Sequence, residues 1–376
     1  MTTLRTTSRR RSPLSAAAVL TASAVLLAGC AAAAADAPTA EEPAAETVTI
    51  TDELGREVEL DIPITAVYGD LWYQSEIIRG IGAGDTIVAI ESSSDPVANP
   101  LNAEYFAAFE GLPVVGHYEE PNWEAIVESG AEVALMRRNG PWEEAVEKLE
   151  PFGIDVVVVT TWDPIVLREY LPLLGEIFGA EEGAAELAAL YDDIEDILAE
   201  RLDEATVKSV YFENNADFVT SVPGSGWHDT IVLGGGENLF GDVNVGNDSS
   251  ASVHQYEVDP VEVIARNPDV IIHTGIDGGV SGYEPWTRDE LTAQTEAIAD
   301  RPGWQATTAV ADEEVYVFNN FFYSALGKQL GALAVATWLY PDRFEDVDID
   351  DYFARWLTSQ GVEPRPVSDY VHKLGQ

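Results

Sequence analysis

Aromatic side chains are the most distinctive candidates for binding chemistry in this sequence, and they fall in short polar segments. Each segment follows a run of apolar or β-branched residues that predicts a strand. The rings in these segments are Trp72, Tyr73, Tyr118, Trp162, Trp227, Tyr283, Trp286 and Tyr323. Aromatic rings offer a large, stiff contact area, and tyrosine and tryptophan add a polar tip. The pattern predicts a site for a bulky solute such as a metal chelate or a macrocycle, although each ring could instead pack inside the protein.

Two adjacent arginines, Arg137 and Arg138, follow the predicted strand "VALM". A guanidinium binds carboxylates through paired N–H donors, so this pair is the best candidate to contact a carboxylate, catecholate or propionate of a ligand. The alternative is that both arginines are solvated and balance local acidic residues. A mixed arrangement would turn one guanidinium into the site and the other toward solvent.

Two histidines could take part in the same site. His228 follows a Gly-Ser-Gly turn and could hydrogen-bond a chelate or ligate haem iron, or it could contact only backbone at a helix start. His117 has similar alternatives, and its neighbour Tyr118 could supply an oxygen ligand to a partly bare metal. No two histidines in the sequence have the spacing of a zinc site, so we predict no metal site and no cofactor of the protein's own.

No motif in the sequence supports covalent catalysis. The segment "DVDIDDYFARWL" resembles a calcium loop, but Asp351 stands where glycine is needed and Leu357 where glutamate is needed. Ser225 in "PGSGW" lacks the spacing of a nucleophile elbow. Acidic residues are so common that a catalytic carboxylate pair stays open, although no particular pair can be argued, and we predict that the protein is not an enzyme. A surface hydrolase that uses carboxylates is the less favoured alternative.

The N-terminus has the pattern of an export signal. Four arginines precede an apolar or small-residue run of 16 residues over 14–29, which is shorter than the roughly 18 residues of a membrane-spanning helix. The run ends in Leu-Ala-Gly followed by Cys30, which resembles the bacterial lipobox, so we predict that Cys30 carries a lipid anchor. The alternatives are a lone packed thiol or a plain secretory signal. Ser8-Arg9-Arg10 is a weak sign of twin-arginine export, and the export route stays open.

The chain after the signal is strongly acidic. All 66 acidic residues and 16 of the 20 basic residues follow position 29, which leaves a net charge of −50. Nucleic acid is therefore excluded as a partner. Residues 31–46 are mostly Ala, Pro, Glu, Asp and Thr, and they have too little apolar bulk to fold, so we predict a flexible tether.

Hydrophobic periodicity predicts an α/β fold. The segment "TVTITDELGREVELDIP" alternates around a glycine turn and predicts a β-hairpin. Pairs of a helix and a short apolar strand follow, which is typical of parallel sheets. A long amphipathic pattern over 181–204 predicts one helix of roughly 36 Å. We predict two lobes joined by this helix, or alternatively a single large sheet domain that contains it.

Four segments together resemble a known family. "ITDELGREVELDIPITAVY", "IGAGDTIVAI", "DPVEVIARNPDVIIHTG" and "RPGWQATTAVADEEVYVFN" are similar, in order and spacing, to the substrate-binding lipoproteins of ABC importers for iron-siderophores, haem and cobalamin. The segment "WLYPDRFEDVDIDDYF" looks closest to the members for iron complexes. The similarity covers roughly residues 48–341.

The resemblance implies two Rossmann-like lobes with parallel sheets, a single linking helix and a ligand cleft between the lobes. The domain limits we expect are a signal peptide at 1–29, a tether at 30–46, an N-terminal lobe at 47–180, the linking helix at 181–205 and a C-terminal lobe at 206–376. In the family an acidic residue on each lobe docks onto the permease. Glu124 matches the first position, whereas Val261 occupies the second and Glu262 is its neighbour. Both glutamates could simply favour helix N-termini.

The function implied is that of a monomeric, lipid-anchored binding protein on the extracytoplasmic face of the cell membrane. It would capture an iron chelate, foremost a ferric siderophore, and deliver it to the permease of an ABC importer. Haem or cobalamin is the alternative ligand. A sensor or adhesion module with the same fold but no permease is a further alternative.

Overall fold

The computed structural model describes residues 46–246, 252–275, 283–319 and 327–376. The predicted signal peptide, Cys30, nearly all of the tether and Tyr323 lie outside these residues, so the predictions made for them are untested. Within the described ranges, no helix combines the length and apolar character needed to cross a membrane.

The chain from residue 46 opens with the expected β-hairpin. Strands β1 (Glu46–Thr51) and β2 (Glu57–Ile62) pair antiparallel, with Ile50 opposite Val58. Ile50, Val58 and Leu60 are buried, as the alternating pattern predicts. The turn between the strands is held by the buried carboxylate of Asp52, whose Oδ1 accepts hydrogen bonds from the backbone N–H groups of Leu54 and Arg56.

The first sheet has four parallel strands in the order β4-β3-β7-β8. They are β3 (Val67–Gly69), β4 (Ile87–Ala89), β7 (Val133–Met136) and β8 (Asp155–Val158). The helices of this half are α1 (Trp72–Gly80), α2 (Trp123–Glu128), α3 (Trp142–Leu149) and α4 (Pro164–Phe178), and a small hairpin joins β5 (Gly116–His117) to β6 (Glu120–Pro121). Alternate residues of β7 enter different cores, because side chains point to opposite faces of a strand.

The second sheet has five strands in the order β11-β9-β13-β14-β15. They are β9 (Lys208–Asn214), β11 (Gly236–Asn238), β13 (Val270–Thr274), β14 (Val315–Phe318) and β15 (Val371–Lys373), of which β15 is antiparallel to its neighbour. A two-stranded ladder joins β10 (Val219–Thr220) to β12 (Tyr256–Glu257). The helices are α6 (Gly226–Leu233), α7 (Pro260–Arg266), α8 (Arg288–Ala299), α9 (Thr308–Ala311), α10 (Gly327–Leu339) and α11 (Ile349–Ser359).

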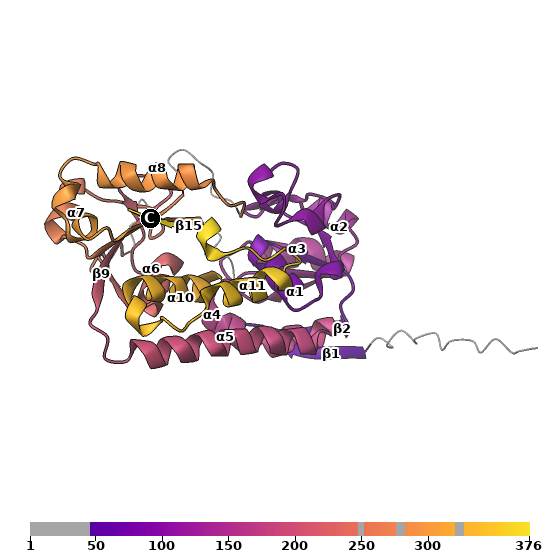
Figure 1. Ribbon diagram of the computed structural model, residues 1–376. Coiled ribbons are helices and arrows are strands. Elements are labelled where there is room, and N and C mark those ends of the chain that lie inside the picture. The colour runs from indigo at the N-terminus through magenta and orange to yellow at the C-terminus, as the bar shows by residue number, and fades with distance from the viewer. Residues whose placement is uncertain (1–45, 247–251, 276–282, 320–326) are drawn as a thin grey trace, which may run out of the picture. The chain divides into compact units, whose positions relative to one another are not determined.

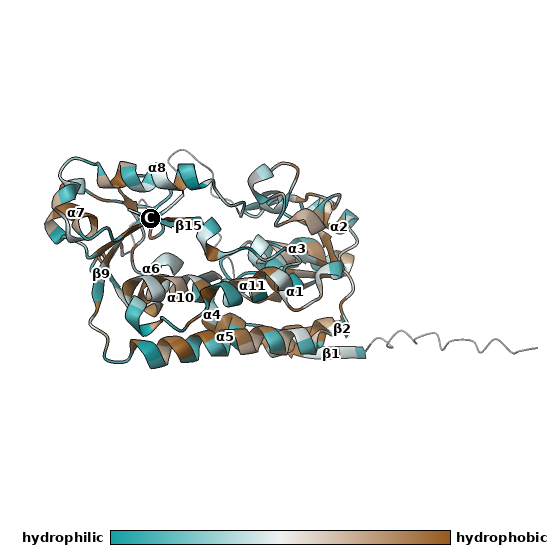
Figure 2. Ribbon diagram, in the orientation of Figure 1, coloured by the Kyte–Doolittle hydropathy of each residue, from teal (hydrophilic) through white to brown (hydrophobic). Residues whose placement is uncertain are grey.

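The expected long helix is α5 (Glu181–Leu202), 22 residues that run without a break. Its buried stripe consists of Ala184, Leu187, Leu190, Tyr191, Ile194 and Leu198. The helix packs against α4 and α1 at one end and against α10 toward the other, so it joins the two halves (Figure 1). Figure 2 shows this amphipathic pattern as hydrophobic and hydrophilic bands that alternate along α5.

The C-terminal helix α11 also connects the halves. It follows α10 in the chain but contacts α1 of the first half. The side chain of Gln360, just after α11, donates from Nε2 to the carbonyl oxygen of Glu76 at 3.0 Å. These features confirm the predicted fold class of two α/β lobes with parallel sheets and a long connecting helix. The exact domain limits stay a prediction.

Candidate ligand-binding site

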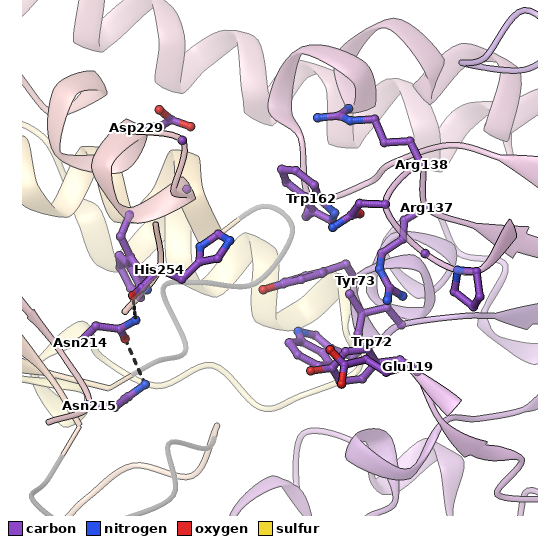
Figure 3. A pocket seen from close by; sticks show the side chains of 18 residues that line it. Trp72, Tyr73, Glu119, Arg137, Arg138, Trp162, Asn214, Asn215, Asp229 and His254 are labelled. Carbon is purple, nitrogen blue, oxygen red and sulfur yellow. Dashed lines mark hydrogen bonds between the residues drawn. The ribbon is translucent and has the colours of Figure 1, made fainter. Parts of the chain in front are cut away.

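A cavity of about 810 Å³ lies between the two halves of the fold. Its walls face each other across an open space in Figure 3. The first half contributes Leu71, Trp72, Tyr73, Tyr118, Glu119, Arg137, Arg138, Asn139, Gly140, Pro141 and Trp162, and the second half contributes Asn214, Asn215, Gly224, Gly226, Trp227, Asp229 and His254. The volume is within the range that pockets for organic ligands occupy.

Most residues of the first wall lie in segments that directly follow the parallel strands of the first sheet. Leu71, Trp72 and Tyr73 follow β3, the segment from Arg137 to Pro141 follows β7, and Trp162 follows β8. These strands run in the same direction, so the segments after them meet at one edge of the sheet, where ligands bind in open α/β folds. On the second wall, Asn214 ends β9 in the same way.

The first wall carries a group of aromatic rings. The ring of Trp72 lies 4.8 Å from that of Tyr73 and meets the ring of Tyr118 edge-on at 5.8 Å. Trp162 contacts two cations: the guanidinium of Arg138 lies 4.9 Å from its ring centre, and the ammonium of Lys328 lies 4.6 Å from it. Such rings give a bulky ligand broad apolar contact without much loss of side-chain entropy.

Arg137 is buried in an ion pair. Its Nη1 lies 2.6 Å from Oδ2 of the fully buried Asp70, and its guanidinium lies 5.1 Å from the ring centre of Tyr118. Burial raises the pKa of Asp70 to about 7, although the charge of Arg137 favours the ionised carboxylate. Arg137 therefore reaches the cavity with an acidic partner already bound.

Arg138 has two acidic partners. Its Nη1 lies 3.1 Å from Oε1 of Glu53, in the turn of the N-terminal hairpin, and its Nη2 lies 2.7 Å from Oδ2 of Asp163. Asp163 also caps α4 by accepting the backbone N–H groups of Ile165 and Val166. Burial alone would raise the pKa of Asp163, but the hydrogen bond from Arg138 holds it below its ordinary value.

Acids on the protein thus balance both arginines, as one of the alternatives in the sequence analysis proposed. Arg138 is partly exposed, whereas Arg137 is buried rather than solvated. Both line the cavity, so neither turns wholly away into solvent.

Lys328, in the first turn of α10, adds a buried cation behind Trp162. Only 2% of its surface is exposed. Burial lowers its pKa from 10.5 to about 8, while Asp229 and Asp163 oppose this change. The ammonium therefore depends on nearby carboxylates and on the face of Trp162 for its stabilisation.

The second wall is rich in amides. Asn215 donates from Nδ2 to Oδ1 of Asn214 at 3.0 Å, and Asn214 donates from Nδ2 to the carbonyl oxygen of His254 at 2.8 Å. Burial, followed by the charge of Lys328, lowers the pKa of His254, which favours a neutral ring. The amides and the neutral ring of His254 can donate and accept hydrogen bonds without adding charge, and Asp229 is the acidic residue of this wall.

Seven of the ligand-binding candidates from the sequence line the cavity, and the structure brings them together. They are Trp72, Tyr73, Tyr118, Arg137, Arg138, Trp162 and Trp227. Trp227 is only 3% exposed and packs on Phe212 at 4.9 Å, so it is part of the core as well.

Four other candidates do not line this cavity. His117 is exposed and its ring contacts Tyr118, whereas His228 interacts with Nδ2 of Asn238 at 3.2 Å. Tyr283 stacks on Tyr105 at 4.0 Å, and Trp286 packs on the core of the second half. A role for these four in ligand binding stays a prediction.

The two permease-docking candidates both lie in the first turn of a helix. Glu124 is exposed on α2. Glu262 on α7 is paired with Arg266 at 2.7 Å, and its neighbour Val261 is 68% exposed. Their positions suit both docking and the simpler effect of acidic residues on a helix N-terminus.

Sequence reasoning missed the polar partners of this site. They are Glu53, Asp70, Glu119, Asn214, Asn215, Asp229, His254 and Lys328. The available signal for three of them was position: Asp70 directly follows one predicted strand, and Asn214 and Asn215 lie at the end of another. Nothing local in the sequence marks His254 or Lys328 as part of the site.

One acidic cluster in the second half has the composition of a metal site. Ligand atoms of Glu213, Asp217 and His273 lie within 4.8 Å of one another. However, the guanidinium of Arg301 binds both carboxylates, with its Nη1 2.8 Å from Oε2 of Glu213. The protein thus supplies its own cation here, and we assign no metal to the cluster.

Comparison with known proteins gives consistent matches. A family model described as periplasmic binding protein matches residues 71–320. The vitamin B12-binding protein of Vibrio campbellii is 24% identical over 200 residues, which cover 53% of this chain and 66% of that protein, just under two thirds of its length. The vitamin B12-binding protein of Yersinia pestis is 21% identical over 225 residues, covering 60% of this chain and 74% of the relative.

Solved structures share the fold. The TroA-like periplasmic binding protein FepB from Veillonella parvula superposes with a TM-score of 0.72 at 18% identity, covering 87% of this chain and all of that one (100%). A periplasmic haem-binding protein from Pseudomonas aeruginosa gives a TM-score of 0.54 at 15% identity, covering 83% of this chain and 99% of that chain.

Proposed function

Because the chain belongs to the periplasmic binding protein family, we propose that it captures a bulky metal complex outside the cytoplasm and delivers it to the permease of an ABC importer. The observation that carries the proposal is the cavity of about 810 Å³ between two α/β lobes, with aromatic rings on one wall and amides on the other. A cleft between two lobes encloses a ligand on both sides and still lets it leave unchanged.

The ligand is an organic complex of a metal rather than a bare ion. Of the first wall, Trp72, Tyr73 and Trp162 offer ring surface, which suits the apolar periphery of a chelate or a macrocycle. A ferric siderophore is our first candidate. Cobalamin is the second, supported by relatives that bear the name vitamin B12-binding protein.

Binding occurs without covalent chemistry. The acidic residues Glu53, Asp70 and Asp163 are each engaged by Arg137 or Arg138, which leaves them poorly suited to act as a general acid and base pair. The family match also points to solute binding.

Delivery requires a position at the membrane and a contact with the permease. We assign the first to a lipid on Cys30 and the second to Glu124 and Glu262, one on each lobe. Exposure of Glu124 in the first turn of α2 supports its part in docking. For Glu262 to dock, its ion pair with Arg266 would have to open or be shared with the partner.

Titration by tryptophan fluorescence tests the proposal. The probes are cyanocobalamin, a ferric hydroxamate, a ferric catecholate and haemin. Because Trp72 and Trp162 line the cavity, a bound metal complex should quench the emission to saturation at one equivalent. Replacing Trp162 by phenylalanine should reduce the amplitude, whereas Trp304→Phe, a buried tryptophan of the second core, should leave the ligand-dependent part intact. Failure of all four probes to bind would contradict the proposal.

A further inference from the structure

Acidic residues neutralise the arginines of the cavity, and we infer that Glu53, Asp70 and Asp163 make the site select a neutral or cationic metal complex over an anionic one. The inference rests on the proposed function and narrows the class of ligand. We infer that the three acidic residues affect ligand specificity indirectly, because they pair with Arg137 and Arg138.

Arg138 is the more accessible of the two arginines, with 35% of its side chain exposed, yet it faces two carboxylates. Glu53 lies 3.1 Å and Asp163 2.7 Å from its terminal nitrogens. Burial lowers the pKa of Arg138, but the hydrogen bonds that its guanidinium donates to Asp163 and Glu53 raise this pKa above its ordinary value. With one positive and two negative charges, this group repels a further anion at short range.

The two acids are held in place by the fold. Oε2 of Glu53 accepts a hydrogen bond from the backbone N–H of Thr160, and Oγ1 of Thr160 accepts one from the backbone N–H of Arg138. Asp163 is fixed as the N-cap of α4. An anionic ligand group would therefore have to break an existing ion pair rather than bind a waiting cation.

Arg137 is less accessible still. Its side chain is only 6% exposed, Asp70 holds Nη1, and Tyr118 lies over the guanidinium. Gly140 packs so closely that a Cβ at this position would lie 3.0 Å from Cγ of Arg137. The side chain therefore has little room to turn toward a ligand.

The other described residues that line the cavity add negative rather than positive charge. Glu119 and Asp229 are exposed acidic residues on opposite walls (Figure 3). The buried Lys328 interacts with Asp229 and Asp163. The net charge of −50 after position 29 also disfavours anionic ligands, at longer range, because it lowers the concentration of anions near the protein.

The chemistry that fits is a complex whose metal charge is already cancelled by its ligand. Neutral corrinoids and neutral or cationic ferric hydroxamates meet this condition. Ferric tris-catecholates carry excess negative charge, and haem carries two carboxylates, so both would face the acidic groups of the cavity, where each of the two arginines is already paired with an acid.

The test compares Kd values for cyanocobalamin, cationic ferrioxamine B and anionic ferric enterobactin at low and at high ionic strength. The wild-type protein should bind at least one of the first two about tenfold more tightly than the third. In Glu53→Gln/Asp163→Asn, which frees Arg138, the affinity for ferric enterobactin relative to the tighter of the other two should rise by about tenfold. Salt should reduce this gain, because the gain is electrostatic.

Two further variants keep the test decisive. Asp229→Asn removes an exposed charge from the cavity wall, caps no helix and should shift the same ratio in the same direction even if the double variant folds poorly. Asp346→Asn is the matched control, because it removes an acid paired with Arg201 away from the cavity and should leave the ratio unchanged.

Preference of the wild-type protein for ferric enterobactin would overturn the inference, as would an unchanged ratio in a folded Glu53→Gln/Asp163→Asn protein or, if that variant does not fold, in Asp229→Asn. The proposed function would survive either result. If none of the three probes binds and haemin also fails, the proposed function falls and the inference falls with it.

Discussion

Gly140 lies directly against the buried ion pair in the wall of the cavity. A Cβ at this position would lie 2.6 Å from Oδ2 of Asp70 and 3.0 Å from Cγ of Arg137. The backbone approaches the buried ion pair so closely that only glycine fits without movement of the pair. Gly140 therefore helps to fix the geometry of the Asp70–Arg137 ion pair. The sequence patterns gave no sign that these three residues lie together.

We predict that Gly140→Ala lowers the free energy of unfolding by about 1–3 kcal/mol, because the added methyl group forces the Asp70–Arg137 pair to shift. Urea denaturation followed by circular dichroism measures the change. Asn139→Ala, in the same loop but exposed, serves as the stability control and should cost less than about 0.5 kcal/mol. Equal stability of Gly140→Ala and the wild type would contradict the close contact.

The buried Lys328 leads to a prediction for how the stability of the protein depends on pH. Its pKa falls from 10.5 in the unfolded chain to about 8 in the folded protein, so the unfolded chain binds more protons between these values. Stability from this group therefore increases as pH rises from about 8 toward 10.5, and the cost of burying the ammonium is largest below pH 8.

Lys328→Met removes the titration and keeps most of the apolar side chain. The free energy of unfolding of the variant, relative to the wild type, should be highest near pH 7 and should decrease as pH rises toward 10. Denaturant midpoints measured across this range provide the test. A constant difference between the two proteins would show that Lys328 keeps an ordinary pKa.

Among the secondary-structure elements, the N-terminal hairpin contacts both the first sheet and the wall of the cavity. Its turn places Glu53 beside Arg138, and Oδ2 of Asp52 accepts a hydrogen bond from the backbone N–H of Val158 in β8 at 3.3 Å. The hairpin therefore anchors the end of the first sheet and supplies part of the cavity's charge balance.

Asp52→Ala should destabilise the protein by about 2–4 kcal/mol, since it leaves the backbone N–H groups of Leu54 and Arg56 and that of Val158 without their acceptor. Thermal unfolding is the measurement. Glu59→Ala, at an exposed position of β2, is the control and should have little effect. A similar result for both variants would mean that the turn contributes little to stability.

Local patterns in the sequence predicted most elements because periodicity is a local property. The β-hairpin, the helix–strand pairs and α5 all follow from repeats of two or 3.6 residues. The structure confirms α5 at Glu181–Leu202, two residues shorter than expected. The sequence patterns did not predict the short strands β11 and β15. Each has three residues, and a segment of that length is too short to show a hydrophobic period.

The candidate site was only partly predictable, for a different reason. The sequence identified Arg137 and Arg138, but their acidic partners lie 67, 85 and 25 residues away in the chain. Such pairs form only when the sheet and the hairpin assemble. Tyr283 shows the opposite case, since its predicted position after a strand did not reveal that it would stack on Tyr105.

For the whole molecule, the dominant electrostatic property is its negative charge. The net charge of −50 after position 29 makes the folded protein repel itself, and the ion pairs of the cavity neutralise only a small part of it. Dissolved salt screens this repulsion over about 10 Å at 0.1 M.

We therefore predict that the melting temperature rises by several degrees when NaCl increases from about 0.05 to about 1 M, since long-range repulsion is screened while buried pairs are less affected. Differential scanning calorimetry measures the change. Choline chloride at equal ionic strength should reproduce it, because screening does not depend on which monovalent cation is present. A melting temperature that falls with salt would indicate that surface ion pairs stabilise the fold more than its charge destabilises it.

The two halves also contact each other directly beside α1. The ring of Tyr283 stacks on Tyr105, and the backbone N–H of Glu104 donates to Oε1 of Glu284 at 2.8 Å. Together with α5 and α11, these contacts limit how far the lobes can separate.

The most direct test is a crystal structure of the protein with its tightest-binding metal complex, with anomalous scattering used to locate the metal. Our expectation is a single metal peak inside the cavity, with the organic part of the ligand against Trp72 and Trp162 on one side and Asn214 on the other. A metal bound elsewhere on the protein, with the cavity free of ligand, would contradict it.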